Sequence, residues 1–287
     1  MKICFHDKSV EGVKLTNTDF IDLLRENHTI TETCDETYDL IFNMSAFDYE
    51  RAEELKTKYS NVPIVNYVWD FYKWAWDGKH GFDWKGYAEF LKKSDLIIVP
   101  SSTQQLRLKE LTGLDSVVVK TGHRMFEAEV SDERFVLDHM RFYPEENERW
   151  VITAGETQYI PVIHPEKSLS REEIEKAIAR CTFLACGYRE ASTGGLAALE
   201  GLWLGKPVLL SNSPYQGGKD YVGEFGTYFQ YDDYNDLKKR MKEMFENPPK
   251  IDVEKARKYI TENFTYEVMA KNLEVEFMKV LSKGGKK

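Results

Sequence analysis

The sequence predicts an α/β protein with two parallel-sheet domains, and three observations carry this prediction. Short apolar runs alternate with helix-length amphipathic segments, the alternation restarts after a polar stretch at residues 124–149, and 287 residues suffice for about two domains. Strand followed by helix, repeated, is typical of a parallel sheet that is covered on both faces. A composition with 42% hydrophobic and 30% charged residues supplies enough apolar side chains for such cores.

The first half contains strand and helix patterns in regular succession. Phe20, Ile21 and Leu24 fall on one side of the first helix, and Gly113 follows the last one as a typical helix terminator. We expect strands at residues 2–6, 38–44, 63–69, 96–99 and 116–120, and helices at residues 17–26, 49–59, 84–93 and 103–111.

The second half repeats the alternation. Ser170 and Glu173 form a capping box at the start of one helix, and Pro248-Pro249 ends another. Residues 135–139 fit either a strand or a helical turn. We expect strands at residues 150–154, 183–186, 207–210 and 227–230, and helices at residues 170–180, 195–204 and 236–245, followed by a mostly helical segment at 254–281.

Composition and motifs exclude several function classes. The 39 basic and 48 acidic residues give a net charge of −9, which is unfavourable for a protein that binds nucleic acid by neutralising phosphates. No apolar run approaches the ~20 residues of a membrane span, and the first residues lack a signal-peptide pattern. The four cysteines are scattered, so we expect reduced thiols in a cytoplasmic protein. The motifs GxGxxG and HExxH are absent, and the six histidines are too dispersed for a local metal site, so no metal is expected.

The informative segment is residues 182–222. Gly194-Gly195 precedes a helix whose N-terminal amides and dipole favour an anion, and Glu200 on that helix can accept hydrogen bonds from two vicinal hydroxyls, as on a ribose. A second pair, Gly217-Gly218, follows the next strand and leads into Lys219-Asp220. Glu200 by itself could be an exposed helix charge, and a glycine pair could be a tight turn. The whole ordered run favours a site for a phosphorylated sugar or nucleotide, because loops at adjacent strand ends form the ligand site of such sheets.

This run resembles the donor-binding half of retaining, nucleotide-sugar-dependent glycosyltransferases related to glycogen and sucrose synthases. These enzymes have two Rossmann-like domains that face each other across a cleft, the GT-B fold. Glu200 matches the family's second Glu, Gly205 with Pro207-Val208 matches the following turn and strand, and Gly217-Gly218 with Asp220 matches the later glycine loop. Residues 94–102 and 106–122 are similar to the end of the family's acceptor domain.

The resemblance implies an acceptor-side domain at residues 1–125, a donor-binding domain at 126–265, and a C-terminal helix at 266–282 that packs back on the first domain. It assigns Glu200 to the nucleotide ribose and Arg141 to the donor diphosphate, where Lys219 or Lys167 replaces a family Lys that does not follow Arg141. The family's first acidic residue stands eight before the second, a position held by Ser192, while the nearest acid is Glu190. The expected catalytic residues are Glu190, Arg141 and Asp70, and the expected donor-binding residues are Ser192, Thr193, Gly194, Gly195, Glu200, Gly217, Gly218, Lys219 and Asp220.

The implied activity is transfer of a sugar from a nucleoside diphosphate sugar to an acceptor hydroxyl, with retained anomeric configuration and with neither a metal ion nor a resident cofactor. The acceptor is open: a small molecule, a glycan, a protein or a modified base. The aromatic segment 69–77 either binds such an acceptor, packs the core or forms the interface of a homodimer. Two alternatives stay open, a catalytically inactive sugar- or nucleotide-binding protein of the same fold and a sugar-nucleotide epimerase.

Overall fold

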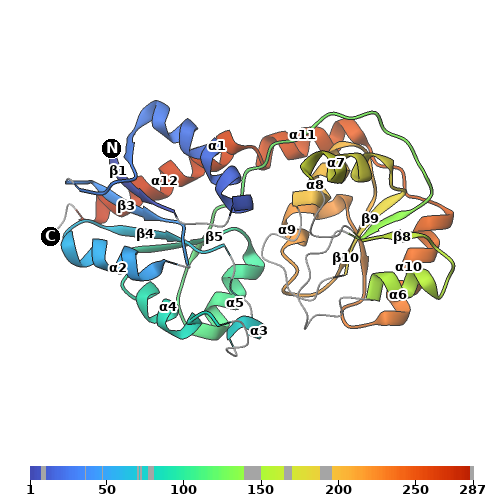
Figure 1. Ribbon diagram of the computed structural model, residues 1–287, viewed down its shortest axis with the longest axis horizontal. Helices are drawn as coiled ribbons and strands as arrows, with labels where there is room; N and C mark the ends of the chain where they lie inside the picture. The colour runs from blue at the N-terminus through green and yellow to red at the C-terminus, as the bar shows by residue number, and fades with distance from the viewer. Residues whose placement is uncertain are drawn as a thin grey trace. The chain divides into compact units, whose positions relative to one another are not determined.

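The computed structural model describes residues 1–7, 11–35, 37–46, 48–69, 71, 73–76, 81–138, 150–164, 170–187 and 196–284. The chain divides into two compact units, one formed by Met1–His123 with Asn263–Lys287 and the other by Arg124–Glu262 (Figure 1). We call them unit 1 and unit 2. Each contains a parallel sheet with helices on both faces, so the predicted α/β class with two parallel-sheet domains is confirmed.

Within its described residues, unit 1 has a six-stranded parallel sheet in the order β2-β1-β3-β4-β5-β6. Its strands are β1 (Lys2–His6), β2 (Thr29–Thr31), β3 (Leu40–Asn43), β4 (Ile64–Tyr67), β5 (Leu96–Val99) and β6 (Val117–Val118). Its helices are α1 (Glu11–Asn27), α2 (Tyr49–Lys58), α3 (Lys73–Trp76), α4 (Trp84–Leu91), α5 (Ser102–Thr112) and α12 (Tyr266–Gly284).

The two faces of this sheet are covered by different helices. On one face, α1 and α12 pack together over Phe42 and Val65 of the sheet. The buried residues Met269, Leu273 and Phe277 recur every four positions, so one side of α12 is apolar and returns the C-terminal segment to unit 1. On the opposite face, α2, α4 and α5 cover Ile41, Ile64 and Ile97.

Within its described residues, unit 2 has a five-stranded parallel sheet in the order β11-β10-β9-β7-β8. Its strands are β7 (Val136–Asp138), β8 (Val162–Ile163), β9 (Phe183–Cys186), β10 (Val208–Ser211) and β11 (Thr227–Phe229). The helical segments are α6 (Trp150–Glu156), α7 (Arg171–Arg180), α8 (Leu196–Trp203), α9 (Gly218–Val222), the 3₁₀ turn η1 (Gly223–Phe225), α10 (Tyr234–Glu246) and α11 (Val253–Asn263). Helices α6 and α10 cover one face of the sheet, and α7 and α8 cover the other.

Two predicted helix boundaries are confirmed by their capping geometry. The Ser170 side chain accepts a hydrogen bond from the Glu173 amide while the Glu173 carboxylate accepts one from the Ser170 amide, which is the predicted capping box of α7. Gly113 follows α5 with φ +76°, in the left-handed region that a glycine adopts without cost.

The strand predicted at residues 150–154 is wrong, because these residues form helix α6. The run Trp-Val-Ile-Thr has strand propensity, but Val151 and Ala154 are buried three positions apart against α10 and the sheet, which is a helical spacing. Residues 135–139 contain strand β7, one of the two alternatives considered. The short strands β2 and β8 and the short helix α9 were not expected.

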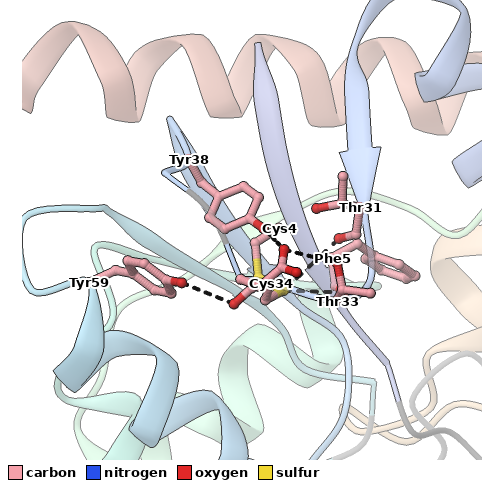
Figure 2. Close-up of a disulfide and its surroundings, with 8 residues drawn as sticks. Cys4, Phe5, Thr31, Thr33, Cys34, Tyr38 and Tyr59 are labelled. Atoms are coloured by element: carbon pink, nitrogen blue, oxygen red, sulfur yellow. Dashed lines mark hydrogen bonds between the residues drawn. A yellow bond between two sulfur atoms is a disulfide. The ribbon is translucent and has the colours of Figure 1, made fainter.

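A disulfide joins Cys4 and Cys34, so the expectation of reduced thiols is wrong for this pair (Figure 2). The parallel register pairs Cys4 with Thr31, which brings Cys34, three residues further on, to a Cα–Cα distance of 5.2 Å. Both cysteines are buried, and the Tyr59 hydroxyl donates to the Cys34 carbonyl at 3.1 Å. Sequence spacing could not show this contact, because it depends on strand pairing across a separation of 30 residues.

The other two cysteines, Cys181 and Cys186, are buried free thiols, and burial raises the pKa of each to about 12. In the part of the chain that the structure describes, no helix is both long and apolar enough to span a membrane.

Candidate functional site

The carboxyl edge of the unit 2 sheet holds the candidate site. The chain leaves β7 toward β8 on one side and later returns to β9 on the other side, so β7 and β9 flank the topological switch point. Ligands of parallel α/β sheets bind outside the carboxyl ends of the strands at such a point. The segments after β9 and β10 lead into α8 and α9, and these two helices contact each other.

The structure describes five of the predicted site residues, all in unit 2: Glu200, Gly217, Gly218, Lys219 and Asp220. Arg141, Asp70, Glu190, Ser192, Thr193, Gly194 and Gly195 lie outside the described residues, as does Lys167. The roles assigned to these residues therefore stay predictions.

Glu200 is not the exposed helix charge that its position alone suggests. Glu200 is only 1% exposed, and it lies in a helix, α8, whose residues from Ala197 to Leu202 are all buried. Gly201 permits this close packing, because a Cβ atom there would lie 2.5 Å from Leu184 Cδ1 on β9. The sequence thus places a carboxylate in the interior on α8, the helix that packs against β9, where an anionic side chain requires a partner.

The partner of Glu200 is Arg171, the first residue of α7. The Arg171 guanidinium donates a hydrogen bond to Glu200 Oε1, and its Nε donates to Glu175 Oε1 at 2.7 Å. The guanidinium also lies over the Phe126 ring, 5.6 Å from its centroid. Burial by itself would lower the pKa of Arg171, but the hydrogen bond and charge of Glu200 outweigh it and raise that pKa.

The loop between β10 and α9 is organised by its own polar side chains. Buried Gln216 accepts a hydrogen bond from the Gly218 amide at 3.1 Å, and the Lys219 ammonium donates to Asn212 Oδ1 at 2.8 Å. Gly217 and Gly218 are both buried at the start of α9. This loop therefore presents a fixed backbone and a half-buried Lys219 that is anchored to the loop.

Asp220, the last predicted residue of this loop, is close enough to two tyrosines to affect their titration. Burial first, then Tyr259 and Asp220, raise the pKa of Tyr228 to about 12. The Tyr228 hydroxyl donates to the Gly223 carbonyl at 2.7 Å. The charge of Asp220 therefore acts on the Tyr228 hydroxyl, which is bonded to the first residue of η1.

A second buried acid, Asp138, is not among the residues that the sequence predicted. It ends β7 at the switch point, fully buried, and its Oδ2 lies 3.2 Å from Nδ1 of His164, which follows β8. Burial raises the pKa of Asp138, and the hydrogen bond from His164 opposes this effect only in part. An acidic residue at the end of a strand could have indicated this position in the sequence. Its pairing with His164, 26 positions away, could not be predicted, because it depends on the β7–β8 register.

The carboxyl edge of the unit 1 sheet is also polar. His6 ends β1 with Nε2 3.3 Å from Asp48 Oδ2, and the Asn43 amide donates to Asn66 Oδ1 at 2.6 Å between the neighbouring strands β3 and β4. These side chains lie at the strand ends of the unit that the resemblance assigns to the acceptor.

The aromatic rings near residue 70 pack within unit 1. The Trp69 ring lies 4.8 Å from that of Tyr67, and the Trp76 ring lies 5.5 Å from that of Phe71. The side chain of Trp74 is outside the described part of the chain. For Trp69 and Trp76, contact with neighbouring rings therefore supports the core alternative over an open binding face.

Among the described residues, no three or more His, Cys, Asp or Glu side chains lie in a group that could hold a metal ion.

Comparison with known proteins identifies the fold. No protein-family model and no curated protein sequence matches the chain. The crystal structure of HepE from Anabaena in complex with UDP and glucose is similar over 97% of this chain and 100% of that chain, with a TM-score of 0.73 and 14% identity. The apo form of the lipopolysaccharide outer core galactosyltransferase WaaB is similar over 97% and 100% of the two chains, with a TM-score of 0.69 and 12% identity. Sucrose-phosphate synthase from Thermosynechococcus elongatus matches over 96% and 81%, with a TM-score of 0.64 and 13% identity.

The chain therefore has the GT-B fold of nucleotide-sugar glycosyltransferases, as the resemblance implied. At 12–14% identity these matches show the fold alone, because one fold hosts many activities.

Proposed function

We propose that this protein is a glycosyltransferase that moves a sugar, most simply a hexose, from a UDP-linked donor to an acceptor hydroxyl with retained anomeric configuration. The observation that supports it best is a buried, ion-paired Glu200 on α8, the helix that follows β9 in unit 2, in a fold shared over nearly the whole chain with HepE, whose structures contain UDP and UDP-glucose. A carboxylate at this place can accept hydrogen bonds from both ribose hydroxyls.

In this proposal the remaining predicted residues bind different parts of the donor and the acceptor. The amides around Gly194-Gly195, the cation of Arg141 and the ammonium of Lys219 stabilise the negative charge that develops on the leaving diphosphate. Glu190 or Ser192, with Thr193, binds the donor sugar. Gly217-Gly218 lets the backbone approach the donor closely, Asp220 closes that loop, and Asp70 binds hydroxyls on the acceptor side.

The reaction breaks the bond between the anomeric carbon and the UDP oxygen and forms a bond from the same carbon to the acceptor oxygen. UDP leaves with the electron pair, and the acceptor proton passes to phosphate or water. We propose that the reaction needs neither a metal ion nor a resident cofactor, so transfer should survive chelation by EDTA. The acceptor is a small molecule, a glycan, a protein or a modified base.

A nucleotide panel tests the donor assignment. Thermal unfolding should be measured with UDP, GDP, ADP, CDP and dTDP for the unaltered chain and for Glu200→Ala. A nucleotide present at about 100 times its Kd stabilises by about 2.7 kcal/mol. UDP should stabilise the unaltered chain, and Glu200→Ala should lose that stabilisation. Glu133→Ala is the matched control, because Glu133 also pairs with an arginine of α7, but this arginine is Arg180, at the opposite end of the helix from Arg171. No shift with any nucleotide would refute the proposal and favour a binding protein of the same fold.

Transfer itself is tested with UDP-glucose and a mixture of candidate acceptors. Release of UDP together with a glucosylated product is the expected result, and proton NMR of the product should show the anomeric configuration of the donor. An inverted product would refute retention, and an epimerised UDP-sugar without transfer would refute transferase activity.

The oligomeric state and the location follow separately. We propose a homodimer, which light scattering of the purified chain tests. The sequence predicts a cytoplasmic location, and the Cys4–Cys34 disulfide argues against it, because such bonds persist mostly in oxidising compartments. Alkylation of thiols, with cells lysed directly into denaturant and alkylating reagent, tests the location. Four alkylated cysteines would support the cytoplasm, and two would contradict it.

A further inference from the structure

Arg171 and Glu200 form a pair in which one partner is buried and the other reaches solvent. The Glu200 side chain is 1% exposed and the Arg171 side chain 52%, so the buried carboxylate is paired with a side chain that reaches solvent. The two residues stand 29 positions apart, on α7 and α8. Neither the family pattern described above nor the spacing of the sequence assigns a role to Arg171.

Three contacts hold the Arg171 guanidinium in place. It donates to Glu200 and to Glu175, and its Cζ lies over the Phe126 ring. The capping box at Ser170 fixes the first turn of α7, and therefore the position from which the Arg171 side chain extends. Fixed contacts of this kind hold the Glu200 carboxylate in a defined orientation and keep a buried anion paired.

The chemistry of the pair matches a vicinal diol. A carboxylate only accepts hydrogen bonds, a guanidinium only donates them, and each hydroxyl of a diol can do both. A carboxylate has about four acceptor positions, so contact with one guanidinium N–H is compatible with contact to hydroxyls.

We propose that Arg171 is a positioning residue for ribose recognition, which orients Glu200 and forms with it a donor–acceptor pair for the 2′- and 3′-hydroxyls of the nucleotide. This inference rests on the proposed function, because it takes the nucleotide to bind at Glu200. It adds a specificity: the protein distinguishes ribonucleotides from deoxyribonucleotides through Arg171.

Binding of UDP and of 2′-deoxy-UDP, measured by calorimetry, tests the proposal. The unaltered chain should prefer UDP by about tenfold or more, because a hydrogen bond to a charged group is involved. Arg171→Met should weaken UDP binding by about the same factor. It should weaken 2′-deoxy-UDP by no more than about threefold, because only the 3′-hydroxyl contact remains to be lost, and so reduce the preference. Arg171→Lys keeps the charge without the fork of donors and should retain part of the preference.

Arg180→Met is the matched control. Arg180 is the last residue of the same helix, its side chain is 49% exposed, and it pairs with Glu133. This variant should keep the preference of the unaltered chain. If Arg171→Met does not unfold cooperatively, Arg171→Lys takes its place and is judged by the same ratio of affinities.

Equal weakening of both nucleotides by Arg171→Met would overturn the inference, since it would indicate a structural or phosphate-binding role. An unchanged preference in that variant, or no preference in the unaltered chain, would also overturn it while leaving the proposed function intact. An unaltered chain that binds no UDP would overturn both.

Discussion

Loss of the Cys4–Cys34 disulfide should destabilise unit 1 by about 3.6 kcal/mol. The bond closes a loop with a sequence separation of 30 residues, and both cysteines belong to unit 1. The chain-entropy relation for a loop of this length gives about 12 cal/mol/K, which is about 3.6 kcal/mol at 25 °C. For a unit of this size the loss corresponds to a decrease in Tm of roughly 7–14 °C.

The assay combines thiol counting with calorimetry. In denaturant without reductant, Ellman's reagent should find two thiols, those of Cys181 and Cys186, and after reduction it should find four. Scanning calorimetry with and without dithiothreitol should then show a shift confined to the transition of unit 1. Cys34→Ala should reproduce the shift without reductant and should be insensitive to dithiothreitol.

Two results would refute this reasoning. Four reactive thiols in the unreduced, denatured protein would show that the bond does not form. An unchanged transition after reduction to four thiols would show that the loop is already constrained in the unfolded chain, so that closing it costs little entropy.

The remaining predictions concern one buried acid and one glycine. Asp138→Asn should make the free energy of unfolding less dependent on pH above about 4. Burial raises the pKa of Asp138 in the native state, so the native protein keeps a proton that the unfolded chain releases. The stability that this proton contributes at low pH is lost as pH rises, by about 1.4 kcal/mol for each pH unit between the native and unfolded pKa values. Urea unfolding of both proteins between about pH 4 and 7 checks this, and parallel pH profiles would contradict it. Gly122→Ala should destabilise unit 1 by about 1–3 kcal/mol, since its Cβ would lie 2.7 Å from the Thr265 carbonyl oxygen and from the Tyr266 Cα, both backbone atoms that cannot turn away. Urea unfolding with an unchanged midpoint would show that α12 shifts at no cost.

Local sequence signals were sufficient for much of the fold. The alternation of apolar runs and amphipathic segments predicted the α/β class and parallel sheets, and Ser170 and Gly113 marked helix ends correctly, because capping involves residues only a few positions apart. The signal failed at residues 150–154, where Trp150 and Val151 have strand propensity but the packing surface of α10 and the sheet favours a helix. Such a choice is made by tertiary contacts, which a local pattern does not contain.

The sequence by itself determined where a ligand-binding residue could stand, and the tertiary structure decided what surrounds it. The order of glycines, Glu200 and the following turn pointed to the segment after β9, since motif and helix are continuous in the chain. Three pairings could not be predicted, because each joins residues 26 to 30 positions apart: Arg171 with Glu200, Asp138 with His164, and Cys4 with Cys34. The burial of Glu200 could not be predicted either, because it depends on how α8 packs. Strand register and helix packing set those distances, and they exist only when the sheets are assembled.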